Sequence, residues 1–190
     1  MQDFTNAPSD LPVPHDDGGA DHLLSMRLPA LGLVSTQGGV VDVSALSGYV
    51  VIYCYPMTGV PGVALPPGWD QIPGARGCTP QNLAYRDHHT DLTELGATVF
   101  GLSTQSTAYQ QEMAERLHLP FAVLSDADMA FAKAMNLPTF HTSGMHLLKR
   151  LTLICKDQHV VAVKYPVFPS NSDAAWAVNC LRAMAQSQLD

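Results

Sequence analysis

Cys78 is the side chain of this sequence best placed to act as a nucleophile. It ends a loop rich in proline and glycine, and a helical pattern starts at once, with Pro80 in the first turn and Gly96 as the C-terminal cap. The start of a helix carries unpaired backbone N–H groups and the positive end of the helix dipole, which stabilise an anion. A thiol placed there ionises more readily than that of a free cysteine, and the thiolate is the reactive form.

Charged residues accompany Cys78. Arg76 and Arg86 add positive charge nearby in the sequence, and Asp87 and His88 follow on the same expected helix. Arg86 and Asp87 are either ions of the helix surface or supports of the reactive centre, and the sequence leaves both interpretations open. His88 lies on the apolar stripe of the helix, which favours a hydrogen-bonded core residue over a proton donor.

The composition excludes several classes of protein. The net charge is −7 and no basic run is present, so nucleic acid is not an expected partner. No apolar run approaches the roughly 18 residues of a membrane helix. The first residues do not resemble a secretory signal, so we expect a cytoplasmic protein. The four cysteines form no C-x-x-C pair and no zinc spacing with the eight histidines, so we expect no disulfide framework, metal or cofactor.

Strands and helices alternate along most of the chain. The expected strands occupy residues 40–43, 50–55, 98–102, 121–124, 151–155 and 160–165, the last two as a hairpin. The expected helices start at Cys78, at a capping box of Thr107 and Gln110, at Ser125 with Asp128, and at Asp173, the last one running to Gln186. Residues 28–35 are expected to be irregular. This order predicts an α/β protein with a mixed central sheet and helices on both faces.

The sequence predicts one domain preceded by an arm. Residues 1–27 are rich in proline, aspartate and glycine and are typical of a loosely attached arm, while residues 28–190 form the domain. Within the domain, residues 57–77 are rich in proline and glycine and contain Trp69. For the part at residues 63–77 we expect a lid, a dimer contact or a partner-docking loop, or else a packed loop with Trp69 as its anchor.

Short stretches spread over residues 28–169 resemble the peroxiredoxins, and they occur in the order that this family has. They are Tyr55-Pro56, Gly77-Cys78-Thr79, Tyr85-Arg86-Asp87, Gly101-Leu102-Ser103, Leu119-Pro120-Phe121, Leu124-Ser125-Asp126 and Arg150-Leu151-Thr152. The bacterioferritin-comigratory, or peroxiredoxin Q, branch is the most similar. The resemblance implies a thioredoxin-like fold with a mixed sheet flanked by helices.

The resemblance also implies an enzyme that reduces hydrogen peroxide or organic hydroperoxides. Cys78 matches the family's peroxidatic cysteine, which attacks the peroxide and becomes sulfenic acid. Arg150 matches the arginine that holds the thiolate and polarises the peroxide, and a planar, permanently charged donor suits both tasks. Without the resemblance, Arg150 would be taken for a surface cation beside Lys149.

The sequence departs from the family at two places. Ala75 stands where the family has a hydroxyl residue three positions before the cysteine, and residues 63–77 look inserted, so that Thr58 and Thr79 are the remaining sources of a hydroxyl. Leu83 stands five residues after Cys78, where many relatives carry a second cysteine.

The other cysteines, Cys54, Cys155 and Cys180, are interpreted as core residues. The resemblance then implies a one-cysteine mechanism in which an external thiol, namely thioredoxin, glutaredoxin or glutathione, reduces the sulfenic acid. The alternative is a non-catalytic redox sensor or binding protein on the same fold, which Ala75 favours. A monomer and a homodimer both remain open.

Overall fold

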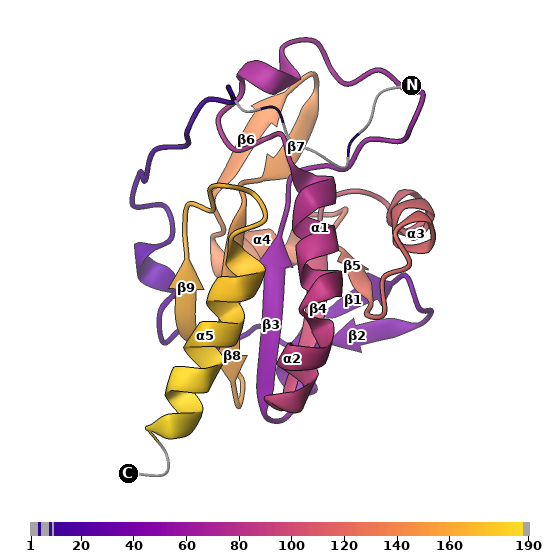
Figure 1. The fold of residues 1–190 in the computed structure, drawn as a ribbon. Helices are drawn as coiled ribbons and strands as arrows, with labels where there is room; N and C mark the ends of the chain where they lie inside the picture. The colour runs from indigo at the N-terminus through magenta and orange to yellow at the C-terminus, as the bar shows by residue number, and fades with distance from the viewer. Residues whose placement is uncertain (1–3, 5–7, 9, 188–190) are drawn as a thin grey trace.

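A computed structural model describes residues 4, 8 and 10–187 of the chain. Within them, a seven-stranded sheet has the order β2-β1-β5-β4-β3-β8-β9 (Figure 1). Its strands are β1 (Gly32–Ser35), β2 (Val40–Asp42), β3 (Tyr49–Cys54), β4 (Ala97–Ser103), β5 (Val123–Ser125), β8 (Leu151–Lys156) and β9 (His159–Lys164). The helices are α1 (Cys78–Asp87), α2 (His89–Glu94), α3 (Thr107–Arg116), α4 (Ala130–Met135) and α5 (Asp173–Gln186).

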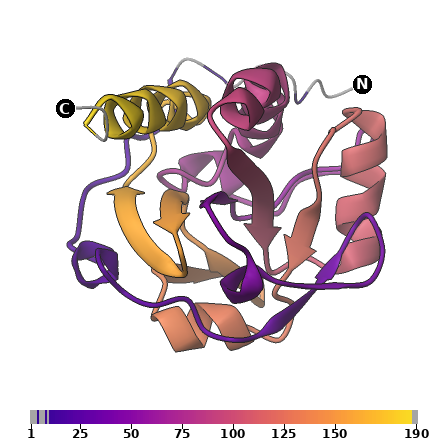
Figure 2. The same ribbon diagram turned by 90° about the horizontal axis from the view of Figure 1, so that it is seen from below.

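The sheet is mixed, as predicted. β3 pairs in parallel with β4 and antiparallel with β8, and β4 pairs in parallel with β5. The apolar runs of β3 and β4 are buried along nearly their whole length, because helices cover both faces. Figure 2 shows α1 and α5 over one face of the sheet and α4 over the other.

The two faces hold two separate apolar layers, and β3 contributes to both by alternation. Its residues Val50, Ile52 and Cys54 pack into the layer under α4. Val51 and Tyr53 pack into the layer under α1 and α5, which also holds Cys78 and its helix. A side chain of one layer can reach the other only if the sheet itself opens.

Two strand pairs differ from the expectation. Residues 32–35 are not irregular but form β1, which pairs with both β2 and β5. The strand has only four residues, one of them glycine, so the sequence shows little of its alternation of exposed and buried positions. A further hairpin, β6 (Thr139–Thr142) with β7 (Met145–Leu148), was not expected. It turns at Ser143 and Gly144, both with positive φ.

The long helix expected after Cys78 is interrupted at His88, which separates α1 from α2. The backbone N–H of His88 donates to Ala84 and its carbonyl accepts from Leu92, so the axis continues through the break (Figure 1). The ring of His88 is half exposed and lies 3.4 Å from Asp91. The prediction that His88 is a core residue is therefore wrong.

The expected capping box of α3 does not form, because Ser106 is the N-cap and Gln110 is fully buried. The amide of Gln110 donates to the Ser103 hydroxyl (2.9 Å) and to the Leu124 carbonyl (2.8 Å). Gln110 thus ties α3 to the ends of β4 and β5.

Helix α4 begins at Ala130 after Met129 as its N-cap residue, and the side chain that caps its first turn is that of Asp126 rather than of the expected Ser125 or Asp128. The buried carboxylate of Asp126 accepts from the backbone N–H groups of Phe131 (2.9 Å) and Ala132 (2.8 Å). Asp128 is exposed and accepts a single bond, from Ala130.

The inserted tract at 63–77 packs on the β6–β7 hairpin through Trp69, which is 3% exposed. Trp69 and Ala75 form a small apolar cluster with Leu147, and Phe140 lies against the indole. The expectation of a packed loop with Trp69 as its anchor is confirmed.

The N-terminal residues that the structure describes lie along the surface of the domain, with Leu23 of η1 (Asp21–Leu23) inserted into the core. The division of the chain at residue 27 stays a prediction, and residues 1–3, 5–7 and 9 of the expected arm lie outside the described residues. Among the described helices, none has the length and apolar character that a membrane span requires.

Replacing the α4 cap tests this account of the fold. We expect Asp126→Ala to lower the free energy of unfolding by about 1–2 kcal/mol, because two buried N–H groups lose their acceptor. Asp128→Ala is the matched control and should have a smaller effect, since its single bond is exposed. Urea denaturation of both variants measures the difference, and an equal loss in the two would contradict the assignment of the cap.

Candidate active site

Cys78 is the first residue of α1, as the sequence predicts. Gly77 precedes it with φ +105°, in the region that favours glycine, and this turn carries the chain from the tract directly into the helix. The side chain is 3% exposed, and its Sγ lies 3.6 Å from the carbonyl oxygen of Ala75. The thiol is therefore nearly enclosed at the positive end of the helix.

Arg150 lies immediately before β8 and brings its guanidinium to the thiol. Its Nη2 lies 3.2 Å from Sγ of Cys78, and the arginine is 3% exposed, so it is not a surface cation. The same Nη2 is surrounded by three backbone carbonyls, those of Gly74 (3.2 Å), Ala75 (3.2 Å) and Arg76 (3.3 Å). The inserted tract thus holds Arg150 with backbone oxygens.

A buried polar network continues from Arg150 to the C-terminal helix. Nη1 of Arg150 donates to Oε1 of Gln81, and the amide of Gln81 donates to Oδ2 of Asp173 at 2.5 Å. Asp173 also accepts from the hydroxyl of Thr152 at 2.7 Å, and Thr152 lies 3.1 Å from the hydroxyl of Tyr85. The chain of contacts joins Cys78 to α5 through side chains of α1 and β8.

Asp173 is fully buried, and burial raises its pKa above the ordinary value. The hydrogen bonds from Thr152 and Gln81 and the charge of Arg150 act in the opposite direction. The carboxyl is thus the acidic counterpart of Arg150 within the network, although one amide separates the two groups.

A second network fixes the backbone of Cys78. The amide of Asn82 donates to the carbonyl of Cys78 (2.8 Å), and the hydroxyl of Tyr53 donates to Oδ1 of Asn82 (2.6 Å). The ring of Tyr53 stacks on that of Tyr85 with centroids 4.0 Å apart. Gly101 allows this packing, because a Cβ there would lie 2.7 Å from the Tyr53 hydroxyl.

The space beside Cys78 is small, with a cavity of about 10 Å³. Phe4, Leu65 and Trp69 contribute to its walls, together with residues 57–59. The guanidinium of Arg76 lies over the ring of Phe4, 5.2 Å from its centroid, and pairs with Asp70 at 3.2 Å. The cavity has room for about one water molecule.

The two threonines considered as sources of a hydroxyl both line this cavity. The hydroxyl of Thr58 is buried and donates to Oε1 of Gln105 at 3.2 Å. At Ala75 it is the carbonyl, and not the side chain, that contacts both Cys78 and Arg150.

Arg86 and Asp87 do not support the site. Arg86 pairs with Asp87 at 2.9 Å and donates to the carbonyl of Leu117, and both side chains are substantially exposed. They are ions of the helix surface, one of the two interpretations that the sequence left open.

The other cysteines are free thiols, and two of them lie on the opposite face of the sheet. Cys54 and Cys155 belong to the layer under α4, and burial raises the pKa of both thiols, that of Cys155 to about 12. Their interpretation as core residues is confirmed. Cys180 is only half-buried, at the margin of the stripe by which α5 packs, and lies about 10 Å along the helix from Asp173.

Gln81, Asn82, Thr152 and Asp173 were not expected from the sequence as parts of the site. Gln81 and Asn82 lie three and four positions after Cys78, so their helical spacing could have indicated them. Asp173 carries no such signal, because only the packing of α5 on α1 brings it close. Among the described residues, no group of three or more histidine, cysteine or acidic side chains could hold a metal ion.

Asp173→Asn provides a test of the buried carboxyl. Burial raises the pKa of Asp173, so the folded protein favours the protonated carboxyl more than the unfolded chain does. The stability that this gives is fully present below the unfolded pKa and is lost as the pH rises through the folded pKa. We expect the stability of the wild type relative to Asp173→Asn to fall as the pH rises above the ordinary carboxyl pKa of about 4. Urea denaturation across this range measures the difference. A difference that stays flat with pH for Asp173→Asn would contradict the account.

Comparison with known proteins agrees with this geometry. The Redoxin family model matches residues 23–178. Peroxiredoxin Bcp of Bacillus subtilis is 30% identical over 114 residues, which cover 60% of this chain and 63% of the relative. The chloroplastic peroxiredoxin Q of Sedum lineare is 31% identical over 112 residues, covering 58% of this chain and 52% of the relative. The match thus spans less than two thirds of the length of these relatives.

Solved structures confirm the thioredoxin-like peroxiredoxin fold. Peroxidoxin BcpB of Mycobacterium tuberculosis superposes with a TM-score of 0.69 at 24% identity, covering 84% of this chain and 96% of the other. Peroxiredoxin Q of Xanthomonas campestris gives a TM-score of 0.64 at 20% identity, covering 92% of this chain and 98% of the other. With its family model matched over most of its length, the chain belongs to the Redoxin family and has the Bcp and peroxiredoxin Q types among its relatives.

Proposed function

We propose that this protein is a thiol-dependent peroxidase that reduces hydroperoxides through Cys78. The observation that carries the proposal is the contact of Cys78 Sγ with Nη2 of Arg150 at 3.2 Å, at the start of a helix and almost out of solvent. A thiolate there has a permanently charged partner, and charge interactions are strong where water is excluded.

The chemistry needs only the thiol, the peroxide and a reductant. The thiolate attacks the terminal peroxide oxygen, the O–O bond breaks, and the leaving oxygen takes up a proton as an alcohol or as water. The sulfur is oxidised to sulfenic acid while the peroxide is reduced by two electrons. Arg150 stabilises the thiolate before the attack and the negative charge that develops on the leaving oxygen.

An external thiol completes the cycle. It attacks the sulfenic acid of Cys78 and releases water, and a second thiol breaks the resulting mixed disulfide. This step is assigned to an outside reductant because Cys54 and Cys155 belong to the other apolar layer and Cys180 lies further along α5. Glutathione, thioredoxin and glutaredoxin all have the required chemistry. Such a cycle suits a reducing compartment, and we propose the cytoplasm.

The small cavity limits the size of the substrate. A space of about 10 Å³ beside the thiol accepts a compact peroxide at the cost of small movements of its walls, and that cost rises with the size of the group attached to the peroxide. Hydrogen peroxide is therefore the preferred substrate, and bulky organic hydroperoxides react more slowly.

Pre-steady-state oxidation of the reduced protein tests the proposed activity. We expect rapid oxidation by hydrogen peroxide, its loss in Cys78→Ser, and a fall of about 10²–10³-fold in Arg150→Lys, which keeps the charge but loses the planar fork. Arg182→Lys, at an exposed position of α5, is the matched control and should react like the wild type. Dimedone labelling and mass spectrometry should place the sulfenic acid on Cys78.

Three outcomes would count against parts of the proposal. A disulfide from Cys78 to another cysteine of the chain would keep the peroxidase but replace the external thiol in the resolving step. Oxidation that is fast but not followed by turnover with any of the three reductants would leave a redox sensor. Oxidation no faster than that of an ordinary thiol would rule out the peroxidase.

Phe4 offers a test of the size limit. Phe4→Ala removes one wall of the cavity, so the rate with cumene hydroperoxide relative to hydrogen peroxide should rise by roughly tenfold, the effect of a modest change in pocket size. Phe168→Ala, an exposed position that does not line this cavity, is the control. An unchanged ratio in Phe4→Ala would show that Phe4 does not limit access.

A further inference from the structure

Two histidines, His141 and His146, face each other across the β6–β7 hairpin. They are direct partners in its antiparallel register, and the turn between them has positive φ at both Ser143 and Gly144. In a hairpin with such a two-residue turn, the pair that flanks the turn exchanges the backbone hydrogen bonds, so the next pair is of the kind whose side chains lie closest. The centroids of the two imidazole rings are 3.9 Å apart, and the ring planes are inclined by 17°.

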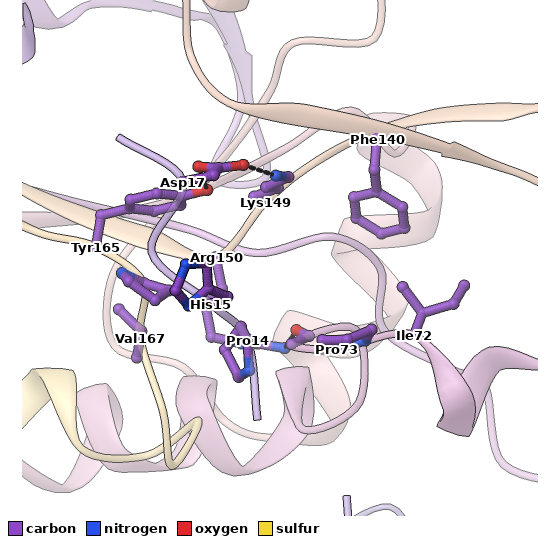
Figure 3. Close-up of a pocket in the computed structure, with 12 residues that line it drawn as sticks. Pro14, His15, Asp17, Ile72, Pro73, Phe140, Lys149, Arg150, Tyr165 and Val167 are labelled. Atoms are coloured by element: carbon purple, nitrogen blue, oxygen red, sulfur yellow. Dashed lines mark hydrogen bonds and ion pairs between the residues drawn. The ribbon is translucent and has the colours of Figure 1, made fainter. Parts of the chain in front are cut away.

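The two rings lie on the face of the hairpin that the inserted tract does not cover. Side chains alternate along a strand, so Phe140 and Leu147 lie on the other face, where they pack with Trp69. Figure 3 shows Phe140 pointing toward Ile72 of the tract, into a cavity of about 310 Å³ that Arg150 also lines. The packing that anchors the tract therefore uses the face opposite to the histidines.

The two imidazoles have lone pairs available for a ligand. Nε2 of His146 lies 2.9 Å from the hydroxyl of Thr139. In the tautomer whose Nε2–H donates to this oxygen, Nδ1 carries the lone pair, and a ring held by its other nitrogen is the usual form of a histidine that binds a metal. His141 is exposed, and among the described residues its ring nitrogens have no hydrogen-bond partner.

The surroundings favour the neutral form of His146. Its partial burial, and after that the charges of His141 and Lys133, lower the pKa of His146 below the ordinary value. A neutral imidazole is the form that binds a metal ion, so this ring needs to release no proton at neutral pH. Lys133, an exposed residue of α4, also repels a metal ion, and its removal therefore provides a test.

We propose that His141 and His146 together bind one divalent late transition-metal ion, with water in its remaining coordination positions. Imidazole suits Ni²⁺, Cu²⁺ and Zn²⁺, whereas Mg²⁺ and Ca²⁺ prefer oxygen ligands. Two nitrogens in neighbouring positions of one ion, each about 2.1 Å from it, lie about 3 Å apart. The stacked rings reach this arrangement by turning about χ2, a torsion with broad preferences in histidine.

An ion bound in this way joins the two strands of the hairpin. An ion that binds the folded hairpin and not the open one makes opening rarer, by mass action. The other face of the same hairpin anchors Trp69 and the tract. The site includes no residue of the Cys78 centre, so it does not depend on the proposed function.

Isothermal titration calorimetry of the reduced full chain with Ni²⁺ tests the site. Ni²⁺ is the probe because, unlike Cu²⁺, it does not oxidise the free thiols of the chain. We expect one saturable site per chain for Ni²⁺ and none for Mg²⁺. His141→Phe and His146→Phe keep an aromatic ring on the strand, and each should lower the affinity at least tenfold, because the second ligand then no longer binds intramolecularly. His159→Phe, at an exposed position of β9, is the matched control and should bind like the wild type.

Two further measurements locate the ion. Lys133→Met removes a repulsive charge, so it should tighten Ni²⁺ binding about twofold to fivefold, and Lys156→Met on β8 is the matched control. Hydrogen exchange of the backbone amides of β6 and β7 should slow when Ni²⁺ is saturating, and this protection should be lost in His141→Phe. Circular dichroism checks that each variant is folded.

Three results would overturn the inference. Affinity that is unchanged in either histidine variant of the pair would place the ion elsewhere on the chain. Half of the bound Ni²⁺ remaining in each single variant would show two independent imidazoles and no shared ion. The absence of saturable binding to the folded wild type would leave the pair as an aromatic contact between the two strands.

Discussion

The structure around Cys78 depends on the burial of one permanent charge, the guanidinium of Arg150. Removal of an ion from water costs several kcal/mol even after the surroundings relax, so the chain has to supply partners. It does so with three backbone carbonyls of the tract, the side chain of Gln81 and the sulfur of Cys78. An arginine held in this way cannot turn away from the thiol without exposing several polar groups. The contact between Arg150 and Cys78 is therefore fixed by the folded structure.

The inserted tract takes part in this arrangement through its backbone. Trp69 anchors it on the β6–β7 hairpin, and this packing fixes the carbonyls of residues 74–76 where they meet Arg150. Ala75 has no hydroxyl, yet its carbonyl contacts both Arg150 and the thiol. The same tract and Phe4 close the space beside Cys78, so one element holds the charged partner and narrows the entrance. The tract therefore holds Arg150 with main-chain carbonyls, and a substitution of side chains changes these groups little.

The sheet separates the thiols of the protein by their environment. Alternation along β3 and β8 directs Cys54 and Cys155 to the layer under α4, where burial disfavours their thiolates. Cys78 lies in the other layer, with a cation and a helix N-terminus beside it. Asp173 connects this layer to α5 through Gln81, so the C-terminal helix is part of the support of Arg150. Within one domain, cysteine thus occurs in two different surroundings: one face of the sheet disfavours the thiolate by burial, and the other places a guanidinium and a helix N-terminus beside the thiol.

The sequence by itself determined the strands β3 and β4, the start of α1 at Cys78 and the bounds of α5, because local patterns of apolar residues and caps specify such elements. It also singled out Arg150, through motifs that keep their order along the chain. The sequence did not predict short elements such as β1 and the β6–β7 hairpin, because a strand of four residues shows too little periodicity. Only the tertiary structure brought Gln81, Thr152 and Asp173 together with Arg150, because contacts between residues 21, 69 and 92 positions apart leave no local pattern. The same holds for the cavity beside Arg150, whose walls come from segments that meet only when the chain is folded.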